Sequence, residues 1–214
     1  VDADNSGDDC DDCAGTPNGD SLLDDCGVCD GGNADDLGCG CFEAGPSGCD
    51  DTCGSTLELD DCGVCGGDGT SCLAFLTLGD FNAISAGGTL EVLYDFGSEV
   101  SGFQFDVSGL NLTGGSGGAA GDAGLQVQAG PNATVIGFDL GGSFIEAGSG
   151  VLTVLSFDDV TADLTELTLG NGGAVSSPDG EAFTTTASGQ VDHSDDLDCA
   201  GAYYGDALVD DCND

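Results

Sequence analysis

The residues in this chain best suited to chemistry are carboxylates placed directly beside cysteines, and they recur. Asp24-Asp25-Cys26-Gly27-Val28-Cys29 returns unchanged at Asp60-Asp61-Cys62-Gly63-Val64-Cys65, and a third copy starts at Asp210-Asp211-Cys212. Residues 198–212 repeat the order of acidic, cysteine and glycine residues found in 12–26. Carboxylate oxygens bind hard cations and paired thiols form disulfides, so the recurrence predicts a repeated structural module rather than a unique active site.

The charge of the chain limits its partners. Its 214 residues include 41 Asp and Glu, one His and no Lys or Arg, which gives a formal charge of −41. Nucleic acids and anionic membrane surfaces are recognised by cationic side chains, so neither is expected as a partner. Membrane insertion is not expected either, because the longest apolar runs, such as 151–155, have only the length of a strand. Self-repulsion must be offset by bound cations or by screening in high salt, and oxygen-only ligands favour calcium.

The predicted calcium ligands lie at the start of the chain and in the repeats. Residues 2–8 place side-chain oxygens at alternate positions around a glycine, as in the first part of a calcium loop, although Cys13 stands where an EF-hand has Glu. A solvated acidic tail is the alternative. The remaining ligands follow from positional equivalence between copies, where Thr56 replaces the first carboxylate in the middle copy. The full set is Asp2, Asp4, Ser6, Asp8, Asp20, Asp24, Asp60, Asp206 and Asp210.

Thirteen cysteines are distributed unevenly, with eleven in residues 1–72, none in 73–192 and two in the tail. Clustered cysteines in so acidic a chain predict disulfides in an oxidising, extracellular setting. Zinc bound at Cys26/Cys29 and Cys62/Cys65 is the less favoured alternative, because 32 residues separate the pairs and other cysteines lie between them. The odd count leaves one cysteine over, and Cys212 is the candidate. The predicted disulfide cysteines are Cys10, Cys13, Cys26, Cys29, Cys39, Cys41, Cys49, Cys53, Cys62, Cys65, Cys72 and Cys199.

Residues 1–72 are predicted to form a small irregular module stabilised by disulfides and calcium, because they hold too few large apolar residues for a core. The opening Asp2-Ala3-Asp4-Asn5-Ser6-Gly7-Asp8 resembles the Asp-rich loops of thrombospondin type 3 repeats, which implies calcium and disulfides in place of a core. The stretch 62–72 resembles part of the cysteine-rich domain of extracellular metalloproteases that carry thrombospondin motifs. That resemblance implies a secreted disulfide module and no catalysis.

Residues 73–192 are predicted to be an all-β domain. Apolar residues alternate with polar ones in short segments separated by Gly, Asn and Pro, a pattern typical of a sandwich of eight or nine antiparallel strands, with a jelly roll as the expected topology. No amphipathic helix of useful length is expected. Core aromatic residues are predicted at Phe103, Phe105, Phe138 and Phe157. The expected strands span residues 73–78, 90–96, 100–107, 125–129, 134–140, 151–157, 164–169 and 182–191.

This half of the chain resembles a cohesin-like domain. The resemblance lies in Gly87-Gly88-Thr89-Leu90-Glu91-Val92, in residues 100–107 and in residues 148–154. It implies a sandwich module of a secreted or surface bacterial protein and, as a function, docking of a calcium-loaded dockerin partner. Related domains also occur in surface proteins without any connection to cellulose.

Three further features bear on modification and on the tail, residues 193–214, where a further Asp- and Cys-rich repeat begins. Asn111 and Asn132 begin sequons and are the candidates for glycosylation. His193 is interpreted as a linker residue, since no nucleophile pattern accompanies it. Tyr203 and Tyr204 are interpreted either as an aromatic anchor on a neighbouring unit or as exposed loop residues.

Three functions are consistent with the sequence. The first is an extracellular structural protein, a subunit or repeat unit of a surface filament or array that assembles with copies of itself, because both ends carry the same repeat. The second is a cohesin-like binding module for a calcium-loaded protein or a glycan. The third, an enzyme using paired carboxylates, is disfavoured, because the Asp pairs recur with the cysteines and no catalytic motif accompanies them.

Overall fold

The computed structural model describes residues 11–85, 87–130 and 132–208, and the chain divides into two compact units. The first unit ends at Asp68 and the second begins at Gly69 and includes the tail. The sequence-based division instead separated residues 193–214 from the sandwich. Within the described residues, no helix is long and apolar enough to cross a membrane.

The first unit consists of turns with very little regular structure. Its paired strands are β1 (Pro46–Ser47) and β2 (Thr52–Cys53), of two residues each. None of residues 11–68 is buried, and large apolar side chains such as Leu22 (75% exposed) and Phe42 (69%) face solvent. This unit therefore has no hydrophobic core within its described residues, as its composition predicts.

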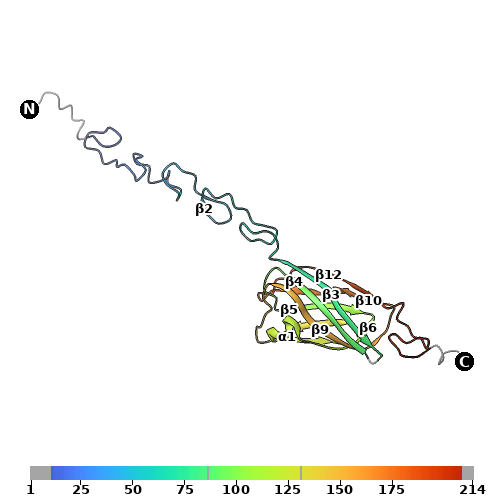
Figure 1. Cartoon of the computed structure of the whole chain (residues 1–214). Helices are drawn as coiled ribbons and strands as arrows, with labels where there is room; N and C mark the ends of the chain where they lie inside the picture. Colours follow the sequence, from blue (N-terminus) through green and yellow to red (C-terminus); the bar gives the residue numbers. More distant parts are fainter. Residues whose placement is uncertain (1–10, 86, 131, 209–214) are drawn as a thin grey trace, which may run out of the picture. The chain divides into compact units, whose positions relative to one another are not determined.

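The second unit is a sandwich of two β-sheets (Figure 1). In the first sheet only one neighbouring pair is parallel, the pair formed by the first and last strands, with Leu73 opposite Thr184. That pair departs from the predicted all-antiparallel arrangement. In order across the sheet, the strands are β12 (Thr184–Ser188), β3 (Leu73–Ile84), β4 (Gly87–Phe96), β9 (Gly148–Val160) and β6 (Leu110–Ser116).

The second sheet is centred on β5 (Gly102–Ser108), which pairs with β8 on one side and with β10 and β11 on the other. A six-residue helix, α1 (Gly118–Ala123), precedes its edge strand and buries Ala120. The helix lies in the glycine-rich segment 114–124, where no helix was predicted. The other strands of this sheet are β13 (Gln190–Asp192), β10 (Leu164–Thr168), β8 (Thr134–Phe138), β7 (Gln126–Ala129) and β11 (Ala174–Ser176).

The core lies between the two sheets and is built from alternating apolar residues, as the period-two pattern predicts. Phe103, Phe105 and Phe157 are buried. The prediction for Phe138 is wrong: it is only partly buried and shares a face with the exposed Ile136. The inward position beside it belongs to Gly137, where an added Cβ would lie 2.1 Å from the ring of Phe103. The predicted all-β sandwich and the disulfide-rich module are otherwise confirmed.

Candidate functional site: the connector turns and their anchor on the sandwich

Asp24 organises a closed turn by accepting backbone N–H groups with both carboxylate oxygens. Its Oδ1 accepts from the N–H of Cys26 at 2.9 Å and of Val28 at 2.8 Å, and its Oδ2 accepts from the N–H of Asn33 at 2.9 Å. The chain reverses through Gly27, whose φ of 77° lies in the left-handed region that favours glycine. This turn explains physically why Asp and Gly recur at a fixed spacing in the sequence.

The same turn forms at Asp12, Asp60 and Asp198. Each Oδ1 accepts the N–H groups two and four residues later at 2.8–3.0 Å. In all four turns, the residue seven positions after the Asp is a glycine whose added Cβ would lie only 2.0–2.4 Å from the carboxylate. We call these four segments turn units, and they span residues 12–19, 24–31, 60–67 and 198–205.

Backbone donors also set the ionisation of these carboxyls. The pKa of Asp12, Asp24 and Asp198 is lowered, and the largest cause in each case is the N–H group four residues later. Hydrogen bonds from N–H groups stabilise the ionised carboxylate relative to the neutral acid. The lowered pKa means that Asp12, Asp24 and Asp198 keep their negative charge to lower pH than an ordinary Asp does.

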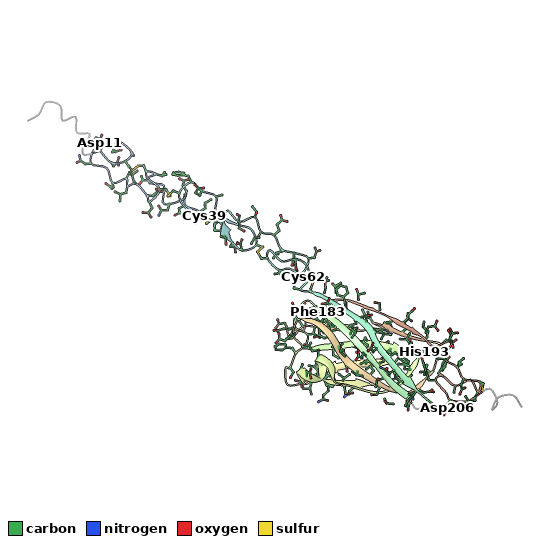
Figure 2. The ribbon with its side chains drawn as sticks, viewed as in Figure 1. Asp11, Cys39, Cys62, Phe183, His193 and Asp206 are labelled. Atoms are coloured by element: carbon green, nitrogen blue, oxygen red, sulfur yellow. A yellow bond between two sulfur atoms is a disulfide. The ribbon has the colours of Figure 1, made fainter. Side chains whose placement is uncertain are left out.

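Four disulfides follow one another along residues 11–68, a segment we call the cystine ladder (Figure 2). The bonded residues are only 14 to 16 positions apart, and each closed loop overlaps the one that follows. Such cross-links stabilise a fold without a core by restricting the unfolded chain. The four bonds are Cys13–Cys29, Cys26–Cys41, Cys39–Cys53 and Cys49–Cys65.

The remaining described cysteines, Cys62, Cys72 and Cys199, are also disulfide-bonded. The zinc alternative is therefore wrong for Cys26/Cys29 and Cys62/Cys65, because their sulfurs are bonded to other sulfurs and supply no thiolate. Cys10 and Cys212 lie outside the described residues. The disulfide-rich character expected from the composition is confirmed.

The predicted calcium ligands are not gathered by the part of the chain that the structure describes. Asp24 and Asp60 direct oxygens to backbone N–H groups of their own turns, and Asp20 and Asp206 are exposed. Among the described residues, no group of three or more Asp, Glu, His or Cys side chains is arranged so that it could hold a metal ion. The other predicted ligands, which lie outside the described residues, are Asp2, Asp4, Ser6, Asp8 and Asp210. Calcium binding stays a prediction.

The last turn unit is held on the sandwich by His193, which the sequence interpretation wrongly took for a linker residue. Its side chain is fully buried. Its Nε2 lies 2.9 Å from the hydroxyl of Thr165 on β10, and its Nδ1 lies 2.7 Å from the hydroxyl of Tyr204. Its ring packs on Phe81 of β3 with centroids 4.8 Å apart. Figure 2 labels His193 where the tail leaves the sandwich.

Both tyrosines of the turn unit contribute to this anchor, which packs on the sandwich of the same unit and not on the neighbouring unit that one sequence interpretation proposed. The hydroxyl of Tyr203 donates to Asp163 in the turn before β10. Burial, followed by the neighbouring Asp196, raises the pKa of Tyr204 to about 12. We call His193, Tyr203, Tyr204, Phe81 and Thr165 the aromatic anchor.

The N-terminal side of the sandwich is joined to the preceding segment by backbone contacts. The N–H of Thr184 donates to the carbonyl of Cys72 at 2.8 Å, and the N–H of Gly97 donates to Leu73 at 3.0 Å. An added Cβ on Gly97 would lie 1.9 Å from the carbonyl oxygen of Thr70. The chain therefore enters β3 through a closely packed segment.

The two sequons differ in their surroundings. Asn132 is exposed in a turn. Asn111 lies in β6, and its side-chain amide donates to Asp158 at 2.6 Å. Only the first presents an amide nitrogen that is both exposed and outside a strand.

Comparisons with known proteins find similarity to solved structures but none by sequence. No protein-family model matches the sequence, and no curated protein matches it. A non-cellulosomal cohesin from the hyperthermophilic archaeon Archaeoglobus fulgidus is 15% identical with a TM-score of 0.41, covering 55% of this chain and 88% of that one.

Two further cohesins are similar to this chain. One is a chain of a type I cohesin–dockerin complex from Clostridium thermocellum, 13% identical with a TM-score of 0.43, covering 56% of this chain and 98% of that one. The other is the second type II cohesin module of an adaptor scaffoldin from Acetivibrio cellulolyticus, 14% identical with a TM-score of 0.37, covering 55% and 89%. The resemblance to cohesins read from the sequence is confirmed.

Proposed function

We propose that this chain is an extracellular structural protein, a subunit or repeat unit of a surface filament or array in which sandwich modules are joined by connectors stabilised by disulfides and calcium. The observation that carries the proposal is that the same turn unit precedes and follows the sandwich, at Asp12 and at Asp198. A domain with one binding or active site does not require a second copy of the turn unit after it, whereas a repeat protein does.

The physical properties of the two kinds of module support this role. The cystine ladder has no core within its described residues and depends on cross-links, whereas the sandwich has an extensive apolar core and no cysteine between residues 73 and 192. Disulfides of this density also favour an extracellular location. In the proposed filament, connectors and sandwiches alternate. Each connector would fix the spacing between sandwiches and carry mechanical load from one to the next.

We further propose that the protein is not an enzyme. The sole histidine is buried between Thr165 and Tyr204, and the recurrent carboxylates of the turn units accept backbone N–H groups. Side chains whose polar atoms are hydrogen-bonded within the protein in this way stabilise the fold. They do not converge on a shared space where a substrate would bind.

Assembly with copies of itself can be tested directly. Sedimentation velocity and negative-stain microscopy of the oxidised chain, with 5–10 mM calcium chloride or with excess chelator, are expected to show chains of particles or larger species when calcium is present, because divalent ions offset repulsion between copies that carry no cations. Particles that stay single in calcium, both in purified protein and in native surface material, would contradict the filament.

Docking of a calcium-loaded protein or a glycan is the second candidate, favoured by the outer face of the second sheet. Ile136 is 39% exposed there and lies in register between Gln104 and Gln128. An exposed aliphatic residue flanked by uncharged hydrogen-bonding side chains suits a protein partner. Capture from the secretome in calcium, compared between the wild type and Ile136→Asp, tests this candidate. A partner lost only in the variant would support docking through this face.

A further inference from the structure

The aromatic anchor contains a chain of hydrogen bonds that runs through the ring of His193. Nδ1 lies 2.7 Å from the hydroxyl of Tyr204, and Nε2 lies 2.9 Å from the hydroxyl of Thr165. A neutral imidazole has one N–H donor and one acceptor nitrogen, and each hydroxyl can donate or accept. A neutral ring therefore satisfies both contacts in either tautomer.

We propose that His193 is a proton-operated latch: the neutral ring holds the C-terminal turn unit on the sandwich, and protonation of the ring releases it. The two states differ in named contacts. Protonation places an N–H on both ring nitrogens, so the hydroxyl that donated to the neutral ring must turn around to accept. The new charge would also sit on a side chain with no exposed surface.

Burial and the charges around the ring decide whether the pKa of His193 is raised or lowered. Burial lowers the pKa of His193 from its ordinary value of 6.5, and this outweighs the attraction of Asp196 and Asp192, which raises it. The turn unit adds the phenols of Tyr203 and Tyr204, and Asp163 lies beyond Tyr203. The side chains that β3 and β10 bring against the ring are Phe81 and Thr165, which do not titrate in this range.

The pH window follows from the sign of that shift. The released turn unit leaves His193 in water with its ordinary pKa, so the released state binds the proton more tightly than the docked state does. Docking is therefore fully favoured above pH 6.5 and weakens as the pH falls through the lowered value. No second histidine can give the sandwich a pH dependence of this kind, because His193 is the sole histidine of the chain.

The composition of the chain makes the spectroscopic signals easy to assign. The imidazole signals in an NMR titration from pH 7.5 to 4.5 come from one residue, and two of the three tyrosines, with no tryptophan present, lie in the anchor. We expect the His193 titration midpoint to fall below 6.5, with tyrosine fluorescence changing at the same midpoint. Amide protection over residues 196–205 should fall at least tenfold across it, while protection in β4 and β9 stays constant.

A matched variant separates the latch from general acid sensitivity. In His193→Phe, an aromatic ring remains but cannot titrate, so protection of the turn unit should be the same at pH 7.5 and 4.5, whether it is high or low. Should the variant fail to fold, the wild-type titration alone decides. Protection of residues 196–205 that stays constant while His193 titrates, or a loss that persists in His193→Phe, would overturn the latch.

Discussion

The ring of Phe81 lies 4.8 Å from the ring of His193, and it also stacks on Phe157 with centroids 5.3 Å apart. Phe157 belongs to the sandwich core, so aromatic contacts continue without interruption from the core to the tail. The C-terminal turn unit is consequently a part of the sandwich domain, and its stability should depend on side chains that lie more than a hundred residues earlier in the sequence.

Replacing Phe81 with alanine tests that dependence. Phe81 is only partly buried, so we expect the free energy of unfolding to fall by about 1–3 kcal/mol, less than for a fully buried phenylalanine. The loss should appear first as a lower melting temperature in tyrosine fluorescence. Phe75→Ala is the matched control, because Phe75 lies on the same strand and is 46% exposed. Equal losses of unfolding free energy in Phe81→Ala and Phe75→Ala would refute a stabilising role for the contact between Phe81 and His193.

Alkaline titration provides a separate measure of the anchor. The pKa of Tyr204 is raised from 10.0 to about 12, so its neutral form is favoured while the turn unit is docked. Docking is therefore fully favoured below pH 10 and should be lost as the pH rises through about 12. Absorbance at 295 nm should show one tyrosine ionising last, and Tyr204→Phe should remove that step. A titration in which Tyr94→Phe removes the last step instead would be inconsistent with the anchor.

The two stabilising agents proposed for the connectors can be separated by removing each in turn. Reduction should unfold residues 11–68, because a disulfide in such a loop contributes about 2–4 kcal/mol and the segment has no core. Chelation with the disulfides intact should loosen residues 1–72 and 193–214 while sparing the sandwich. Hydrogen exchange read by mass spectrometry distinguishes the regions. Calcium has no structural role if chelation changes nothing in the oxidised protein.

The sequence was informative wherever short-range chemistry decides the outcome. Alternating apolar residues predicted the strands, and cysteine density predicted the cross-linked module. The recurrent Asp residues are predicted as metal ligands, and that prediction stays open, because carboxylates at a fixed spacing look the same in a sequence whether they face a cation or their own backbone N–H groups. The hydrogen bonds of Asp24, the positive φ of Gly27 and the close approach of Gly31 to Asp24 reveal the turn.

Contacts between residues distant in sequence were beyond such reasoning. Thr165 and His193 are 28 positions apart, and neither belongs to a recognisable motif. The tyrosine pair Tyr203 and Tyr204, which stands where the first repeat has Pro17 and Asn18, was the one signal that pointed to the anchor. Phe138 is predicted to lie in the core, but the inward position belongs to its neighbour Gly137, which carries no hydropathy signal although an added Cβ there would meet the ring of Phe103.

Gly137→Ala tests whether Gly137 packs against the ring of Phe103 in the second sheet. The added Cβ would lie 2.1 Å from the ring of Phe103, which is itself buried, so neither group can move aside easily. Overpacking of this kind typically costs about 1–3 kcal/mol. Gly114→Ala is the control, because an added Cβ on that strand glycine meets no atom within 4 Å. Urea denaturation should show a lower midpoint for the first variant alone, and equal midpoints would contradict the packing.

Glycosylation, if the source organism performs it, should distinguish the two sequons. Asn132 is exposed in a turn, whereas Asn111 lies in β6 with its amide bound to Asp158. An N-glycan requires a free side-chain amide nitrogen that the transferase can reach, so Asn132 should carry the modification and Asn111 should not. Mass spectrometry of protein from a glycosylating host should show a glycan that Asn132→Gln removes and Asn111→Gln leaves in place. Equal occupancy of both asparagines would mean that β6 forms only after modification, because the strand's pairing with β9 otherwise holds Asn111 opposite Asp159.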